Sequence, residues 1–206
     1  LSRKAAKEKC AVSYLDTLSP GDILPAKVTH LDCFGAFADI GCGVVGLLPL
    51  DSLSVSRIFH PGDRLFAGED IRVVLKSNKD GRYYLSHKEL LGTWEENAAR
   101  FAQGQTAAGI VRSIESYGIF IELTPNLTGL ADPTPGVNVG DSAAVYIKSI
   151  LPERMKIKLA VVDTLPAPSL PPAVPEYDKF ATAGLSRIDI FRYSPFVCAK
   201  VVETVF

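Results

Sequence analysis

The sequence predicts an all-β fold with linker helices, made of two tandem five-stranded barrels followed by a C-terminal β-rich tail. The first observation is a repeat, because CFGAFADIGCGVVGLLPL at 33–50 aligns with SYGIFIELTPNLTGLADP at 116–133 when one segment is shifted by 83 positions. The shift places Phe34 on Tyr117 and keeps the glycines in step, which marks a repeated structural unit. The second observation is that each copy holds five short, apolar and β-branched runs separated by turn residues, a pattern typical of strands.

In the first copy the five runs form a meander of three strands and a hairpin of two. The expected strands cover 23–31, 34–40, 44–49, 70–76 and 82–86. An Asp-Gly pair between the last two runs is a strong hairpin signal. Five short strands with a glycine corner between the first two suit the OB-fold, a small Greek-key barrel.

The second copy repeats the same five runs. They cover 106–114, 117–123, 127–131, 142–150 and 155–161. The two copies differ mainly between strands three and four, because Gly46 and Gly68 are 22 positions apart whereas Gly129 and Gly140 are 11 apart. Loops tolerate such changes in length, so we expect the same barrel in both copies.

The domain order follows from the two repeats and the segments around them. We expect a linker helix that follows a preceding repeat at 1–18 and a first barrel at 19–86. A connecting helix at 87–104 should lead to a second barrel at 105–162, followed by a proline-rich linker and a β tail at 163–206. The start of the chain resembles the end of the first copy, since both carry a Leu-Ser pair before a helical stretch. We therefore expect the chain to be part of a longer array of repeats.

The connecting helix is predicted from residues that are typical of helix starts and ends. The segment Ser86-His87-Lys88-Glu89 has the pattern of a capping box, in which the two outer side chains satisfy backbone amides at a helix start. A hydrophobic stripe follows at helical spacing, formed by Leu91, Trp94, Ala98 and Phe101. Gly104 is placed to end the helix, and we expect Trp94 to lie between the helix and a barrel.

The amino-acid composition changes in the last part of the chain. Five of the ten residues in 166–175 are proline, which is typical of an extended linker. The segment 176–206 alternates apolar and polar residues, so we expect strands docked on an open barrel edge. In that arrangement Ile188, Ile190 and Phe206 would face inward.

The composition argues against several classes of protein. A net charge of −1 disfavours binding to nucleic acid through bulk positive charge and leaves local basic patches as the route. The four cysteines form no CxxC and have no histidine at zinc-like spacing, so we expect free thiols, no metal and no cofactor. No apolar stretch approaches the ~20 residues of a membrane helix, so we expect a cytoplasmic protein without a membrane partner.

Catalysis is not expected. A nuclease or phosphorolytic enzyme would need clustered carboxylates for metals or a glycine loop that holds phosphate. Asp39 and Asp51 belong to no such cluster, no G-x-x-x-x-G-K-[ST] loop occurs, and the three histidines have no evident acid–base partner. The sequence therefore predicts neither an enzyme nor a small-molecule substrate.

One set of spaced motifs carries a family resemblance. The motifs are G-x-x-x-x-x-x-V-x-x-x-x-x-F-G-A-F from Gly21, then G-L-L from Gly46, then R-x-x-L-S from Arg82. The set resembles the S1 domain, the RNA-binding OB repeat of bacterial ribosomal protein S1, which is also found in polynucleotide phosphorylase and several ribonucleases. The resemblance covers about 19–162, and the connecting segment is similar in particular to S1-like proteins of clostridial-type Firmicutes. It implies a bacterial RNA-binding protein of translation that holds single-stranded RNA or mRNA, with the small ribosomal subunit as a second expected partner.

The resemblance also implies a site. In the family, two aromatic residues of the second strand stack on bases, beside a basic residue near the end of the last strand. Residues three apart on a regular strand face opposite sides, so Phe34 and Phe37 share a face only if the chain bends at Gly35. Lys156 or Arg154 would replace Arg82 in the second copy. The full set of candidate RNA-binding residues is Phe34, Phe37, Lys27, Arg57, Arg82, Arg112, Tyr117, Phe120, Lys148 and Lys156.

Three departures from the family pattern keep an alternative open. The family's histidine after Gly-Leu-x is Pro49 here and Asp132 in the second copy, and its acidic residue near the basic one is Asn78. Both copies keep their aromatic pair, so weak binding by each barrel could add up through linkage. The alternative is a pair of degenerate barrels that docks a protein or anchors the array to the ribosome.

Overall fold

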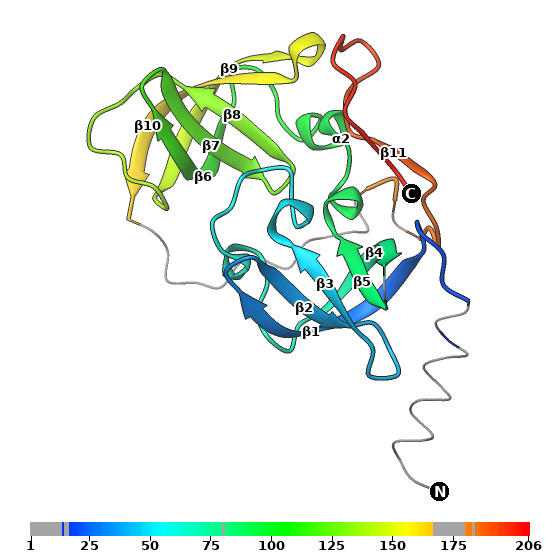
Figure 1. Cartoon of the computed structure of the whole chain (residues 1–206). Helices are drawn as coiled ribbons and strands as arrows, with labels where there is room; N and C mark the ends of the chain where they lie inside the picture. The colour runs from blue at the N-terminus through cyan, green and yellow to red at the C-terminus, as the bar shows by residue number, and fades with distance from the viewer. Residues whose placement is uncertain (1–13, 15–16, 80, 167–179, 183) are drawn as a thin grey trace, which may run out of the picture.

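We describe a computed structural model of the chain, and the description covers residues 14, 17–79, 81–166, 180–182 and 184–206. The expected helix over 1–18 and most of the proline segment lie outside the described residues. Within them, Figure 1 shows two barrels beside one another, with the C-terminal tail running past the short helix α2.

The first barrel is closed, with its strands in the order β1-β2-β3-β5-β4. The strands are β1 Ile23–Asp32, β2 Gly35–Asp39, β3 Val45–Pro49, β4 Asp70–Lys79 and β5 Arg82–Ser86. Strands β3 and β5 pair in parallel and all other pairs are antiparallel. Alternate residues point inward, so Ala36, Leu48 and Leu85 are fully buried in the barrel core.

The second barrel has the same closed topology, in the order β10-β8-β7-β6-β9. Its strands are β6 Thr106–Glu115, β7 Gly118–Thr124, β8 Leu127–Ala131, β9 Ser142–Leu151 and β10 Lys156–Leu165. The first two strands of each barrel carry a bulge at the same place, between Val28 and His30 and between Val111 and Ser113. Such bulges increase local twist and help a small sheet to close. The two predicted five-stranded barrels are confirmed.

Between the barrels the chain differs from the single helix expected over 87–104. The described structure has a 3₁₀ turn η3 at Lys88–Leu91 and a short helix α2 at Trp94–Ala98. They are separated by Gly92, whose φ of 81° is left-handed and where a side chain would collide with the ring of Phe180. The capping box belongs to Thr93 and Glu96, whereas the Ser86 hydroxyl donates to the Glu89 carboxylate. Trp94 is buried, as expected.

Three further 3₁₀ turns complete the described helical structure. They are η1 Leu50–Ser52, η2 Pro61–Asp63 and η4 Pro152–Arg154. The first two lie in the long segment between β3 and β4 of the first barrel, where the two copies differ most in length.

The tail strands are not part of either closed barrel, but the tail pairs with the start of the first barrel through an antiparallel bridge between Asp22 and Arg187. Its strands β11, Ile190–Arg192, and β12, Glu203–Val205, pair with each other. Backbone bonds tie the segment before β11 to the first barrel, where Gly21 accepts from the Ile188 amide at 2.8 Å. Ile188 is buried and Phe206 packs partly against the core, but Ile190 is 63% exposed, so its expected inward orientation is wrong.

A turn of the second barrel fastens the two barrels and the tail together. The Asn126 side chain accepts from the Val55 amide at 3.0 Å and donates to the carbonyls of Lys88 and Gly92, each at 2.8 Å. The Asn126 carbonyl accepts from the Tyr193 hydroxyl at 2.5 Å. Every polar group of this buried asparagine side chain therefore has a partner in a different segment, which fixes the barrels relative to each other.

A buried charge cluster crosses the same interface. Arg64 Nη2 from the first barrel and Arg112 Nε from the second lie 2.5 and 2.7 Å from the same Oε2 atom of Glu122. Arg112 also lies 3.7 Å from Asp63, and Arg64 Nε donates to the Ser54 hydroxyl. Burial lowers the pKa of Arg64, and the Glu122 carboxylate opposes that shift. The long segment between β3 and β4 thus supplies the first barrel's share of the interface.

His87, at the end of the first barrel, predicts an acid-sensitive stability. Its ring is fully buried and donates from Nδ1 to the Arg72 carbonyl at 2.9 Å, and burial lowers its pKa to about 4 from 6.5. Because the unfolded chain takes up the proton first, stability is complete above pH 6.5 and falls as the pH drops toward 4. The loss is about 3 kcal/mol at 1.36 kcal/mol for each pKa unit.

Urea unfolding of the wild type and of His87→Gln between pH 7 and pH 4 measures this effect. The glutamine cannot take up a proton, so the difference between the two stability curves should shrink as the pH falls. Two parallel curves would mean that the pKa of His87 is the same in the folded and the unfolded chain.

Candidate nucleic-acid interface

The candidate site of the first barrel begins at the turn between β1 and β2. Phe34 occupies this two-residue turn, is 51% exposed, and its ring centroid lies 5.9 Å from that of Phe37 at an interplanar angle of 90°. At Gly35 a side chain would collide with the Leu48 carbonyl, so only glycine allows this close strand pairing. The two rings thus share a face, as predicted, but the turn at Phe34, outside the regular strand, is what brings them together.

The second barrel repeats this geometry. Tyr117 is 65% exposed, and its ring centroid lies 6.0 Å from that of Phe120 at an interplanar angle of 87°. A side chain at Gly118 would come within 2.6 Å of the Ala131 carbonyl, so the same close pairing is needed here. Edge-to-face contacts of this kind hold the rings in place while leaving one face of each exposed aromatic ring open to a ligand.

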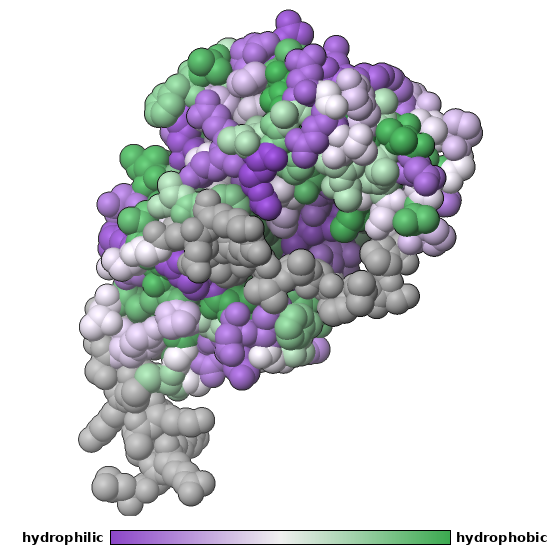
Figure 2. Space-filling model, turned by 180° about the vertical axis from the view of Figure 1, so that it is seen from behind, coloured by the Kyte–Doolittle hydropathy of each residue, from purple (hydrophilic) through white to green (hydrophobic). Residues whose placement is uncertain are grey.

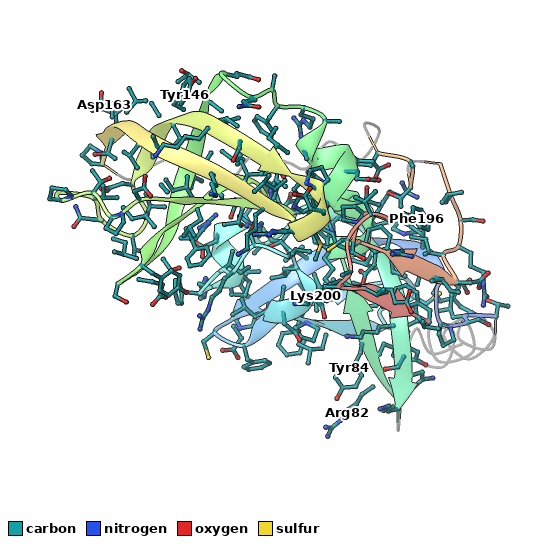
Figure 3. The ribbon with its side chains drawn as sticks, turned by 90° about the horizontal axis from the view of Figure 1, so that it is seen from above. Arg82, Tyr84, Tyr146, Asp163, Phe196 and Lys200 are labelled. Atoms are coloured by element: carbon teal, nitrogen blue, oxygen red, sulfur yellow. The ribbon has the colours of Figure 1, made fainter. Side chains whose placement is uncertain are left out.

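The rest of the first barrel's face follows from the strand register. Phe37 pairs with Leu47, and Leu47 pairs with Tyr84, so these three side chains form a row on the outside of the barrel. Arg82 lies two residues before Tyr84 and therefore on the same face. Figure 3 shows both side chains pointing away from the barrel. His30 pairs with Phe37 and stacks on it, with centroids 6.3 Å apart at 25°.

The same register identifies the equivalent residues in the second barrel. Phe120 pairs with Leu130, and Leu130 pairs with Lys158, so Lys158 takes the place of Tyr84. Lys156, two residues earlier, then takes the place of Arg82, whereas Arg154 lies in the turn η4. Of the two alternatives that the sequence left open, the position of Lys156 is the one that matches.

We define the two faces by these residues and keep the names below. The first face consists of His30, Phe34, Phe37, Arg82 and Tyr84, and the second face consists of Tyr117, Phe120, Lys156 and Lys158. Sequence analysis missed His30, Tyr84 and Lys158. The available signal was the alternation of R-x-Y in 82–84 and K-x-K in 156–158, which places the two outer residues of each triplet on one side of a strand.

Three of the other predicted basic residues are exposed, but acidic or aromatic neighbours contact them. Lys148 lies 2.6 Å from Asp132, and this hydrogen bond lowers the pKa of that carboxyl group. Lys27 lies 4.0 Å from Asp70. Arg57 is on the segment between β3 and β4, with its guanidinium carbon 5.8 Å from the centre of an exposed phenylalanine ring. Pairs as exposed as these contribute little to stability, so the lysines can exchange partners for phosphate.

Arg112 is the predicted residue whose position rules out the expected role. Its side chain is buried and bound to Glu122 at 2.7 Å within the interface between the barrels. The prediction of an RNA contact at Arg112 is therefore wrong, and the residue helps to join the two barrels instead. Glu122 is a hairpin neighbour of Arg112, but the sequence could not show that Arg64 of the first barrel packs onto the same carboxylate and buries the pair.

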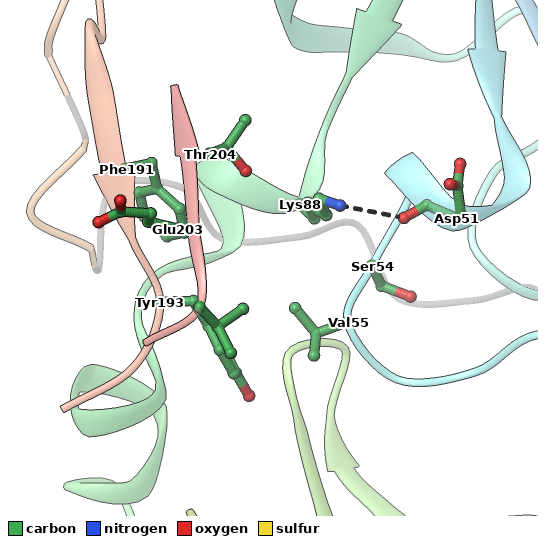
Figure 4. A pocket seen from close by; sticks show the side chains of 9 residues that line it. Asp51, Ser54, Val55, Lys88, Phe191, Tyr193, Glu203 and Thr204 are labelled. Atoms are coloured by element: carbon green, nitrogen blue, oxygen red, sulfur yellow. Dashed lines mark hydrogen bonds between the residues drawn. The ribbon is translucent and has the colours of Figure 1, made fainter. Parts of the chain in front are cut away.

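A pocket of about 240 Å³ lies between the tail strands and the first barrel, lined by Asp51, Ser54, Lys88, Phe191, Tyr193 and Thr204 among others. Figure 4 marks a hydrogen bond in this pocket that the Lys88 ammonium donates to the Asp51 carbonyl at 3.4 Å. In the part of the chain that the structure describes, no group of three His, Cys, Asp or Glu side chains could hold a metal ion.

Across the described ranges no helix is long and apolar enough to cross a membrane. On the side seen in Figure 2, hydrophilic and hydrophobic residues are interspersed over small areas.

Comparison with protein families identifies the first barrel. Residues 17–88 match the model of the S1 RNA binding domain. The chain is 32% identical over 179 residues to the small ribosomal subunit protein bS1 of Leuconostoc lactis, covering 78% of this chain and 42% of that protein. It is 34% identical over 184 residues to the bS1 protein of Staphylococcus epidermidis, covering 81% and 47%. The chain thus spans about half the length of the curated relatives that it matches.

Comparison with solved structures gives matches over part or most of the chain. GSP13 from Bacillus subtilis is 22% identical with a TM-score of 0.33, over 34% of this chain and 55% of that protein. A multidomain protein with nucleic acid binding domains from Streptococcus pneumoniae is 18% identical with a TM-score of 0.33, over 71% of this chain and 54% of that protein.

Proposed function

Because residues 17–88 belong to the S1 RNA binding domain family, we propose that this chain binds single-stranded RNA or mRNA across its two barrels and acts in translation. Its relatives carry the name of a small ribosomal subunit protein, which supports the ribosome as the place of action and the small subunit as a partner. A cytoplasmic location accompanies this proposal.

The observation that carries the proposal is the pair of exposed aromatic rings at the same turn of each barrel. Phe34 and Tyr117 are each more than half exposed although they are large apolar side chains, and each has a basic residue on the same barrel face. Exposed rings beside scattered cations are what proteins use to stack bases of a single strand while neutralising its backbone. Little sequence preference is expected from this mode of binding.

The proposal is tested by fluorescence anisotropy with a labelled single-stranded RNA of about a dozen nucleotides, a length that one or two OB barrels can cover. We expect dissociation constants in the micromolar range and a loss of affinity as salt rises, because phosphate contacts release counterions. Double-stranded RNA of the same length is the control and should bind less well, because its bases are not free to stack. A flat titration with several unrelated RNA sequences at low salt would contradict the proposal.

The second candidate function is docking of a protein, or anchoring of a repeat array to the ribosome. The exposed Asp132 carboxylate beside Lys148 favours it, because this negative charge disfavours the approach of RNA phosphate. The net charge of −1 points the same way. We place it second because both aromatic pairs keep their exposure. Neither function requires this chain to be an enzyme.

A further inference from the structure

We propose that the two barrels hold different parts of the same RNA strand, the first face mainly its bases and the second face mainly its phosphates. The proposal rests on the proposed function and deepens it, because it assigns each barrel a chemical class of contact. It depends on two positions at which strand register makes the two faces equivalent but the residue types differ.

The first face is the more aromatic of the two. Beside Phe34 and Phe37 it carries the His30 ring, stacked on Phe37, and Tyr84, which lies in the same row of paired residues. Four rings on one face offer surfaces for more than one base, and stacking tolerates any base. Among the five residues of this face, Arg82 is the one with a full positive charge.

At the equivalent positions the second face has polar or charged side chains in place of aromatic rings. Ser113 pairs with Phe120 where His30 pairs with Phe37, so one ring is lost. Lys158 stands where Tyr84 does, so a second ring becomes an ammonium group. Together with Lys156 it places two exposed lysines on one strand face, two residues apart. Two such cations can bind successive phosphates but cannot stack on a base.

The proposal requires one strand to reach both faces, and the interface between the barrels holds the two faces in a fixed arrangement. Asn126 and the Arg64–Glu122–Arg112 cluster hold the barrels in one arrangement, with Ser56 adding a bond to the Pro125 carbonyl at 3.0 Å. A strand bound at one face is therefore presented to the other at a high effective concentration. This makes differences between the faces measurable in a single titration of the whole chain.

The experiment compares Tyr84→Ala with Lys158→Ala in the full chain, using a labelled oligouridine and a range of salt concentrations. Tyr84→Ala should weaken binding about tenfold or more, because one stacking surface is lost, and should leave the slope of log affinity against log salt unchanged. Lys158→Ala should reduce that slope by roughly 0.7, the value for one phosphate contact on a single strand. Tyr84→Phe and Lys158→Arg are the matched controls, since they keep the ring and the charge.

A second RNA of equal length with abasic positions separates bases from phosphates. With this probe the effect of Tyr84→Ala should disappear, whereas the change of slope caused by Lys158→Ala should remain. Equal salt slopes for both variants, or an unchanged Tyr84 effect on abasic RNA, would overturn the division between the faces. Failure of the wild-type chain to bind oligouridine would instead contradict the proposed function itself, so the two failures are distinguishable.

Discussion

Glu122→Ala is expected to lower the free energy of unfolding by about 3–5 kcal/mol, the usual cost of removing one partner from a buried charge cluster. Glu122 is 5% exposed, and a single one of its oxygens contacts the guanidinium groups of Arg64 and Arg112 at 2.5 and 2.7 Å. Without the carboxylate, two buried cations from different barrels face each other with no anion between them. Urea unfolding at neutral pH, followed by circular dichroism, measures the change.

Asp132→Ala is a matched control, because Asp132 forms an ion pair of similar length at an exposed position. Asp132 lies 2.6 Å from Lys148, and its side chain is 78% exposed. Exposed pairs are typically worth about 0.2–1 kcal/mol, so Asp132→Ala should change stability only slightly. If Glu122→Ala proved no more damaging than Asp132→Ala, the cluster would not be what holds the barrels together.

The double variant Phe34→Ala/Tyr117→Ala is expected to lose most RNA binding while keeping its fold. Stacking on such a ring contributes roughly 1–3 kcal/mol for each base, so each substitution should weaken binding about tenfold or more. Both rings are more than half exposed and lie in turns outside the barrel cores, so the thermal midpoint should change little. Anisotropy with single-stranded RNA and thermal unfolding of the same samples give both quantities.

Phe196→Ala is the control for an exposed aromatic residue outside the two faces. Phe196 is 83% exposed on the tail and contacts Arg192, whose guanidinium carbon lies 4.4 Å from the ring centre. This substitution should leave RNA binding unchanged. A double variant that melts many degrees lower but binds normally per folded molecule would show that Phe34 and Tyr117 serve the fold rather than the ligand.

The fold could be predicted because its determinants are local and occur twice. The hairpin turns, the glycines at close strand pairings and the alternation of apolar residues each act within a few residues, so a constant offset of 83 positions was enough to identify both barrels. The aromatic pairs were predictable for the same reason. Phe34 and Phe37 belong to one hairpin, and no distant residue is needed to bring them together.

Other residues of the candidate site required the strand register. Tyr84 joins Phe37 through Leu47, and Lys158 joins Phe120 through Leu130, by pairing of strands that are far apart in sequence. A one-residue change in strand register would have turned Tyr84 or Lys158 toward the barrel core. Alternation along a single strand shows which residues share a side, but it does not show which residues of other strands lie beside them. His30 was missed because the bulge after Val28 changes which residue lies opposite Phe37.

By itself, therefore, the sequence determined the number of strands in each barrel, the repeat and the pairs of exposed rings. Tertiary structure alone decided the roles of residues whose partners lie in another segment. Arg112 became part of the interface because it shares the Glu122 carboxylate with Arg64 of the other barrel, and that carboxylate lowers the cost of burying both charges. Ile190 faces solvent because the tail pairs with the first barrel only up to Arg187, after which β11 pairs with β12 and buries Phe191 in place of Ile190. Local patterns specify hairpins, but burial of a charge or a tail depends on which surfaces remain free once the barrels have formed.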